Sequence, residues 1–199
     1  MTMVTTTGPL DSTIITYLKK DLLLREGHFA FRSGRHSKVL LDRDRLLADS
    51  QAASRMGYAL AKTFFTAKID TVAAPSIWGA GLAQWVAYFL EPRAKIVYAT
   101  PLPEGGWRIA PNLHDLIRDR RVLLIDNLMV SGQTIQRFDT EVSELGGEVL
   151  GIGTLWAGAA TVVRGHEVFG LFNHLYPAYE QDDCPLCKAS DVPVETVHY

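Results

Sequence analysis

The sequence contains little cysteine: its 199 residues include two, Cys184 and Cys187. Two cysteines are too few for a disulfide framework of the kind that holds small secreted domains together. Long apolar runs are missing as well. The richest stretch, residues 77–90, contains Gln84 and two glycines and is shorter than the about 20 residues that a membrane-spanning helix needs. The N-terminus shows neither the early positive charge nor the apolar segment of a secretory signal. We therefore expect a cytoplasmic protein with no membrane partner.

An excess of charge of either sign is also absent. Twenty Lys and Arg residues stand against 22 Asp and Glu residues, which gives a net charge of −2. The basic face that is typical of a nucleic-acid-binding protein is therefore not expected. A small anionic ligand is not excluded, because its site needs only a few cations or backbone amides. The apolar fraction of 47% at this length predicts one folded domain with a substantial core.

Strand-like and helix-like segments alternate along most of the chain. Such alternation is typical of a parallel sheet that is covered by helices on both faces. The runs at 122–125 and 149–155 are almost continuously apolar, as buried parallel strands are. We therefore predict an α/β fold with a mainly parallel sheet of about five strands. The expected strands are 70–74, 95–99, 121–125, 148–156 and 167–171, and the helices between them are expected to start near 49, 81 and 132.

The N-terminal part of the chain has a different pattern. Asp11 or Ser12 can cap a first helix, which Gly27 is expected to stop. Two strand-like runs follow at 28–31 and 38–42, and a Ser-Gly-Arg-His turn separates them. This arrangement predicts a hairpin.

Proline and glycine mark the remaining boundaries. Residues 100–112 contain three prolines and two glycines, so a long loop is expected there. The expected organisation is a flexible tail at 1–10, a main domain at 11–180 that includes the hairpin at about 28–42, and a tail with a Cys-x-x-Cys motif at 181–199.

The most informative stretch is Arg-Val-Leu-Leu-Ile-Asp126-Asn-Leu-Met-Val-Ser131-Gly132-Gln133-Thr134. It reads as a buried strand that ends at Asp126, a short loop, and a helix start. Ligands of open α/β sheets bind beyond the carboxyl ends of the strands, and the free amides of a helix N-terminus attract phosphate. Helix capping by Asp126 or Ser131 is the simpler alternative. Neither a P-loop nor a G-x-G-x-x-G motif is present.

This stretch resembles the phosphoribosyl-pyrophosphate (PRPP) signature of type I phosphoribosyltransferases, with Asn127 in place of the second acid and Val130 in place of a common threonine. Residues 29–37, Phe-Ala-Phe-Arg-Ser-Gly-Arg-His-Ser, resemble the N-terminal hairpin of orotate phosphoribosyltransferases. The Cys-Pro-Leu-Cys segment at 184–187 resembles one near the end of some members of that family. The resemblance covers roughly residues 12–190.

The resemblance implies transfer of ribose 5-phosphate from PRPP to a nitrogen of a nucleobase, with release of pyrophosphate and with Mg²⁺ as cofactor. It also implies a homodimer, and a small hood over the base formed by the hairpin. Ordinary βα-loop and core-packing roles are the alternatives for the residues concerned. By resemblance, Asp126 is a candidate catalytic residue, and Asp126, Asn127, Ser131, Gly132, Gln133, Thr134, Pro75, Ser76 and Gly79 are expected to bind PRPP. The hood would place Phe29 and Phe31 at the base. Two residues that depart from the family pattern are further candidates: Arg108, as the cation of the loop, for catalysis, and Trp156, which could stack on a flat base.

Four departures from the family pattern concern the leaving group and the base. Asn127 carries no charge, Trp78 replaces a usual glycine, and no lysine occurs between Lys95 and Lys188, where loop lysines are expected. The Asp-Arg pair that usually binds the orotate carboxylate is replaced at Trp156-Ala157. Two hypotheses follow. The chain is an active transferase for orotate or a related base, or it is a degenerate member that binds PRPP or a nucleotide for regulation.

Cys184 and Cys187 have the spacing of half a zinc site. The other half would come from His174, His198 or a second subunit. Free buried thiols are an equally weighted alternative, and a redox pair is a less favoured one. Zn²⁺ at these cysteines is therefore a hypothesis.

Overall fold

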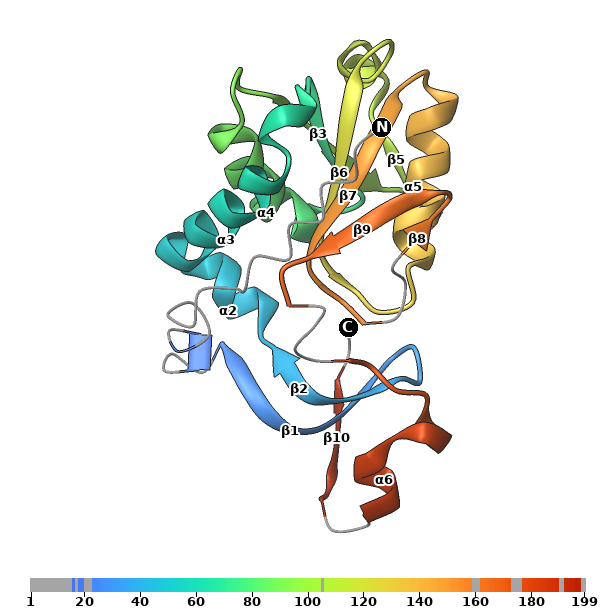
Figure 1. Cartoon of the computed structure of the whole chain (residues 1–199). Coiled ribbons are helices and arrows are strands. Elements are labelled where there is room, and N and C mark those ends of the chain that lie inside the picture. Colours follow the sequence, from blue (N-terminus) through green and yellow to red (C-terminus); the bar gives the residue numbers. More distant parts are fainter. Residues whose placement is uncertain are drawn as a thin grey trace.

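The computed structural model describes residues 16, 18–19, 23–104, 106–158, 162–172, 177–189 and 192–197. Their largest element is a seven-stranded sheet of order β5-β4-β3-β6-β7-β9-β8 (Figure 1). Its strands are β3 (Thr71–Ala74), β4 (Lys95–Pro101), β5 (Trp107–Ile109), β6 (Arg121–Met129), β7 (Glu148–Ala157), β8 (Val162–Val163) and β9 (His166–Gly170).

The α/β fold is confirmed, but the sheet has seven strands and not five. The strands β4, β3, β6, β7 and β9 are mutually parallel and match the five expected ones. The two additional strands, β5 and β8, are antiparallel edge strands of three and two residues. Strands this short are too brief to show a hydrophobic period, so the sequence pattern could not predict them.

Helices cover both faces of this sheet, as the almost continuously apolar strands require. In Figure 1, α3 (Ser50–Thr63) and α4 (Ile77–Phe89) lie on one side and α5 (Gln133–Glu144) lies on the other. Along β6, Leu123 and Ile125 pack with the core on the α3 and α4 side, whereas Val122 and Leu124 pack with the core on the α5 side. This period of two is the consequence of strand geometry.

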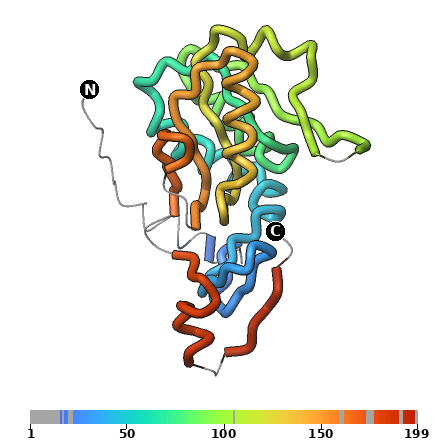
Figure 2. Tube along the Cα trace, turned by 90° about the vertical axis from the view of Figure 1, so that its right-hand side faces the viewer, coloured from blue at the N-terminus to red at the C-terminus, as the bar shows by residue number. Residues whose placement is uncertain are grey.

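The hairpin forms a separate three-stranded sheet, which we call the hood. It consists of β1 (Leu24–Phe31), β2 (His36–Leu41) and β10 (Val194–Val197), with β10 parallel to β1. Figures 1 and 2 show the C-terminal segment beside the hairpin, below the main sheet. The hairpin is confirmed, but the expectation that Gly27 stops a helix is wrong, because Gly27 lies within β1. The expected first helix falls mostly outside the described residues, as does the tail at 1–10.

Short helices connect these parts. They are α2 (Arg43–Ala48), η1 (Phe65–Ala67), η2 (Pro111–Leu116), η3 (Gln181–Asp183) and α6 (Pro185–Ala189). The Asp42 and Asp49 carboxylates accept amide hydrogen bonds at the N-termini of α2 and α3. Among the described residues, no helix has the length and apolar composition needed to cross a membrane.

Residues 100–112 do not form one long loop. The hairpin of β4 and β5 and the short helix η2 occupy most of this segment. The Trp107 ring packs against Phe138 of α5 with ring centroids 5.4 Å apart, and the Ile109 amide donates to the Glu141 carboxylate at 2.7 Å. These contacts join residues that are about 30 positions apart, so the local content of proline and glycine could not reveal them. The expectation of one long loop is therefore wrong.

Candidate active site

The candidate ribose-binding residues lie inside a strand. The expected strand end at residue 125 is wrong, because β6 continues to Met129 and pairs with β7 as far as Ala157. Asp126 and Asn127 therefore have a paired strand on one side. Only residues 130–132 connect β6 to α5, which holds the N-terminus of α5 close to the end of the strand.

Asp126 is almost buried, with 8% of its surface exposed. Burial raises the pKa of its carboxyl to about 6, although the Asn127 amide and the charge of Arg43 oppose the rise. The Asn127 amide donates to Asp126 Oδ1 at 2.8 Å. A carboxyl whose pKa is strongly shifted by burial is a candidate for a functional residue.

The first turn of α4 meets Asp126, because the expected loop at 74–79 is already helical from Ile77. A Cβ atom on Gly79 would lie 3.1 Å from the Ile125 carbonyl oxygen and 3.4 Å from Asp126 Oδ1. Glycine is therefore what permits the close approach of α4 and β6. The Ser76 hydroxyl accepts from the Gly79 amide at 3.4 Å and caps α4, which starts at Ile77 and not near residue 81.

Asn127 connects the same two segments. Its Nδ2 donates to the Trp78 carbonyl at 3.4 Å, and its Oδ1 accepts from the Leu128 amide at 2.7 Å. A carboxylate has no donor and could not make the first of these bonds. The departure from the family's second acid therefore replaces a charge with a hydrogen bond to the first turn of α4.

The N-terminus of α5 presents backbone amides at the end of β6. Gly132 is its N-cap residue with φ of +79°, a backbone conformation that suits glycine. Gly132 is buried, whereas Ser131, Gln133 and Thr134 are exposed. In this described segment no side chain caps the helix closely, since the Ser131 hydroxyl is 3.5 Å from the Gln133 amide. The simple capping interpretation of Asp126 and Ser131 therefore has little support.

The candidate base-site residues lie where the hood meets the main sheet. Phe31 and Trp156 are in contact, with ring centroids 5.4 Å apart. Trp156 pairs with Leu128, two residues beyond Asp126 on β6. Phe29 is also buried, and the Arg25 guanidinium covers its ring at 5.5 Å.

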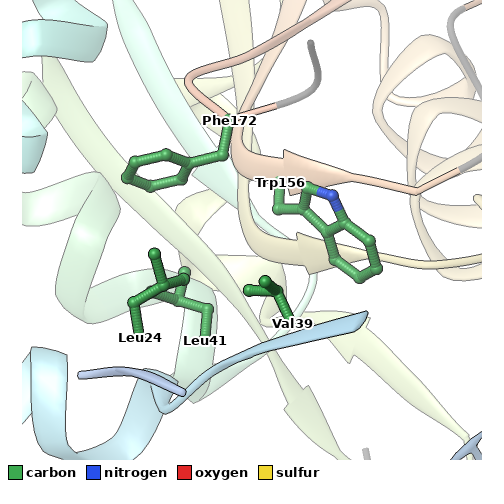
Figure 3. Close-up of a pocket in the computed structure, with 5 residues that line it drawn as sticks. All are labelled: Leu24, Val39, Leu41, Trp156 and Phe172. Atoms are coloured by element: carbon green, nitrogen blue, oxygen red, sulfur yellow. The ribbon is translucent and has the colours of Figure 1, made fainter. Parts of the chain in front are cut away.

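A small apolar cavity lies beside this contact. Figure 3 shows the side chains that line it, from the hood, from β7 and from the turn after β9: Leu24, Val39, Leu41, Trp156 and Phe172. Its volume of about 10 Å³ is room for about one water molecule. A nucleobase bound here would therefore require the hood to move away from Trp156.

Arg108 is the one candidate that the fold keeps apart from the others. It is exposed on β5, which lies three strands from β6 in the sheet. At about 4.8 Å per strand the separation is about 14 Å. Its charge acts on Glu141 of α5, where it lowers a carboxyl pKa that burial raises.

Arg43 is a cation near the site that sequence reasoning missed. Its guanidinium lies over the Trp78 ring at 5.3 Å, and its charge lowers the pKa of Asp126. It follows the Asp42 cap of α2 directly and is one of several nearby arginines. No motif distinguishes it from its neighbours, so only the packing of α2 against α4 identifies it.

The cysteines have partners that the sequence did not suggest. Cys184, Cys187, His28 and His36 bring four possible ligand atoms within 4.8 Å of one another. The proposed partners His174 and His198 lie outside the described residues. The two histidines come from the hairpin, more than 140 residues earlier in the chain, and no local pattern connects them with the Cys-x-x-Cys motif.

Comparisons with known proteins extend over most of the chain. It is 34% identical over 179 residues to the orotate phosphoribosyltransferase of Thermus thermophilus, covering 87% of this chain and 93% of that protein. The orotate phosphoribosyltransferase of Caldanaerobacter subterraneus is 26% identical over 176 residues, with 88% and 90% covered. No model of a protein family matches the chain.

Solved structures show the same fold. The orotate phosphoribosyltransferase of Mycobacterium tuberculosis superposes with a TM-score of 0.62 at 16% identity and covers 80% of this chain and 94% of its own. That of Aeropyrum pernix has a TM-score of 0.58 at 20% identity, with 79% and 92% covered. The similarity thus involves nearly the full length of these proteins.

Proposed function

Because the chain belongs to the orotate phosphoribosyltransferase family, we propose that it transfers ribose 5-phosphate from PRPP to orotate or a closely related base and releases pyrophosphate. In this reaction the bond from ribose C1 to the pyrophosphate oxygen breaks, and a bond from C1 to a ring nitrogen of the base forms. One observation carries the proposal: Asp126 lies in the last half of β6 against Gly79 in the first turn of α4, and the N-terminus of α5 follows β6 after three residues.

Each part of this arrangement has a role in the proposal. Asp126 accepts hydrogen bonds from the ribose hydroxyls, and Asn127 holds the first turn of α4. The amides and hydroxyls of residues 131–134 bind the 5-phosphate, because a helix N-terminus favours an anion. Pro75 and Ser76, just before α4, and Gly79, in its first turn, face the pyrophosphate.

Mg²⁺ accompanies PRPP in this family, and the residues present fit it. Magnesium is usually held by one or two carboxylates together with substrate phosphates and water, and Asp126 supplies one buried carboxylate beside the proposed PRPP site. When bound, the ion neutralises charge on the departing pyrophosphate. Asp126 positions the ribose in its ionised form, which prevails above pH 6.

The departing pyrophosphate has to be stabilised by positive charge in the transition state. The loop lysines that supply this charge in the family pattern are absent here. Preorganised charges commonly contribute about 10²–10³ in rate each. We propose that Arg43 provides part of this support within the chain, because its field already reaches Asp126. Arg108, on the exposed β4–β5 hairpin, would act at the site of a second subunit.

The base is assigned to the contact between the hood and β7. Phe31 and Trp156 provide two aromatic faces, which suit a flat ring; Phe29 completes the wall beside them. The missing Asp-Arg pair leaves the recognition of an orotate carboxylate to other groups. An assay with orotate and with related bases therefore has to identify the acceptor.

Assembly as a homodimer in the cytoplasm is part of the proposal. Exposed aromatic residues gather on α3, η1 and α4, where Tyr58 and Tyr88 each make an edge contact with the half-buried Phe89. Apolar surface of this kind commonly marks an interface between proteins. Light scattering of the purified protein should give the mass of two chains.

The experiment that tests the proposal measures Mg²⁺-dependent release of pyrophosphate from PRPP. Orotate and a panel of other bases serve as acceptors, and the Asp126→Ala variant serves as control. Release that depends on one base and disappears in the variant supports the transferase and identifies its acceptor. PRPP binding without base-dependent release would support the regulatory alternative, which the names of the relatives do not favour.

A further inference from the structure

Four metal-binding side chains meet at the junction of the hood and the C-terminal segment. His28 lies on β1, His36 begins β2, Cys184 follows η3 and Cys187 lies on α6. His28, His36 and Cys184 are buried, and Cys187 is half-buried. Such a group of nitrogen and thiol ligands, drawn from three separate segments, is not needed for the proposed transfer reaction.

The spacing of the ligand atoms matches a tetrahedral zinc site. Bond lengths of about 2.0–2.1 Å for nitrogen and about 2.3 Å for sulfur give tetrahedral edges of about 3.3 Å between nitrogens and about 3.6 Å between nitrogen and sulfur. His28 Nε2 lies 2.9 Å from His36 Nδ1, 3.5 Å from Cys184 Sγ and 3.5 Å from Cys187 Sγ. Cys187 Sγ lies 3.2 Å from His36 Nδ1. Shifts of a few tenths of an ångström would make room for the ion.

A hydrogen bond outside the cluster orients one of the ligands. His28 Nδ1 lies 3.2 Å from the Val192 carbonyl oxygen, which only accepts hydrogen bonds. Nδ1 is therefore the protonated nitrogen, and the lone pair of Nε2 points at the two sulfurs and at His36. A carbonyl acceptor on the remote nitrogen is the usual outer partner of a histidine that binds a metal.

We propose that His28 Nε2, His36 Nδ1, Cys184 Sγ and Cys187 Sγ bind a structural Zn²⁺ that fastens the C-terminal segment to the hood. Two thiolates and two imidazoles in a tetrahedron select zinc over the harder Mg²⁺ or Ca²⁺. Four protein ligands leave no position for a substrate, so the ion has a structural role.

The C-terminal part of the hood is held by the pairing of β10 with β1 over four residue pairs, and a metal would add a further link. In the described residues, β10 has four residues and three of them are exposed. The other links are a bridge between His36 and Tyr179, and ion pairs from Arg35 to Glu180 and from Arg25 to Glu195. Exposed ion pairs contribute little stability, whereas a metal that binds only the folded form contributes its full binding free energy to the fold.

The site also has a consequence for the proposed reaction. His28 is three residues from Phe31 on the same strand, and Phe31 contacts Trp156. Loss of the ion would loosen the strand that carries this base-site side chain. This expectation rests on the proposed function: metal removal should raise KM for the base more than it raises the Kd for PRPP. The residues proposed to bind PRPP lie on or next to β6, α4 and α5, outside the hood.

Metal content tests the site independently of activity. Protein purified under reducing conditions from zinc-supplemented medium should contain about one zinc per chain by mass spectrometry, and Co²⁺ exchanged for it should show the visible spectrum of tetrahedral thiolate coordination. The Cys184→Ser and Cys187→Ser variants should each lose more than about 100-fold in zinc affinity, above the cost of changing an outer partner alone. His166→Gln, which changes a histidine outside the cluster, should retain the metal.

A thiol assay on the unaltered protein avoids any folding defect of the variants. The chain has no other cysteine, so every thiol that reacts with a disulfide reagent belongs to this cluster. Both thiols should be protected until a chelator is added and should then react together with zinc release. Metal-free protein with two reactive thiols, a disulfide between the cysteines, or zinc that both serine variants retain would overturn the proposal. The pyrophosphate assay on the unaltered protein tests the transfer reaction whatever these metal and thiol measurements show, so the two proposals fail separately.

Discussion

Replacement of Asp126 by asparagine should stabilise the protein while removing its affinity for PRPP. The change keeps the size of the side chain and an oxygen that can accept from the Asn127 amide. It removes a negative charge from a residue that is 8% exposed. Burial raises the pKa of that carboxyl from 3.8 to about 6, so the ionised form destabilises the folded state.

The size and the pH dependence of the effect follow from this pKa. Folding favours the protonated form, so the cost is absent below the unfolded pKa, grows as the pH rises towards 6, and is constant above it. A shift of this size corresponds to about 3 kcal/mol. The Asp126→Asn variant should therefore be up to about 3 kcal/mol more stable than the parent at pH 8 and nearly equal to it at pH 4.

Urea unfolding followed by tryptophan fluorescence at pH 4, 6 and 8 measures this difference. Asp70 provides a control of opposite sign, because the Arg121 guanidinium holds the pKa of its carboxyl at about 2. That lowered pKa stabilises the fold above pH 3.8 and its contribution is lost as the pH falls towards 2, so Asp70→Asn should destabilise the protein at pH 8. A gain for Asp126→Asn that does not change between pH 4 and 8, or a loss at pH 8, would refute the reasoning from burial.

Four further predictions concern the same site. The value of kcat/KM should fall as the pH drops below about 6, where Asp126 becomes protonated; a profile that is flat to pH 5 would contradict the role of its carboxylate. Thr134→Val should weaken PRPP binding by about tenfold through loss of one hydrogen bond to a charged group, and an unchanged Kd in calorimetry would remove Thr134 from the phosphate site. Gly79→Ala should cost about 1–3 kcal/mol in stability through overpacking against Ile125 and Asp126 and should also weaken PRPP binding; normal values for both would show that α4 can shift. Arg43→Gln should lower kcat by about 10² and move the acid limb of the pH profile upwards, whereas Arg45→Gln, at an exposed neighbour, should leave both unchanged; equal effects of the two would exclude a specific role for Arg43.

Long-range packing gives the residues that depart from the family's motifs new contacts close to Asp126. Asn127 lacks the charge of the family's second acid, but its side-chain amide donates a hydrogen bond to the Trp78 carbonyl. Arg43 brings a cation to the same place, over the Trp78 ring. Both contacts involve Trp78, so the substitutions at residues 78 and 127 belong together, whereas the loop without lysines lies on the β5 side of the sheet, away from Asp126.

The sequence by itself determined the parallel sheet, the hairpin and the position of the PRPP signature, because each depends on local order. Buried strands such as residues 122–125 are apolar throughout, and a helix start directly after β6 follows from the nearby Gly132. The tertiary structure alone decided which distant groups meet. The two-residue β8 is too short for any periodicity, and the joining of His28 and His36 to Cys184 and Cys187 spans nearly the whole chain. Such contacts depend on how completed elements pack, and no local pattern of residues encodes them.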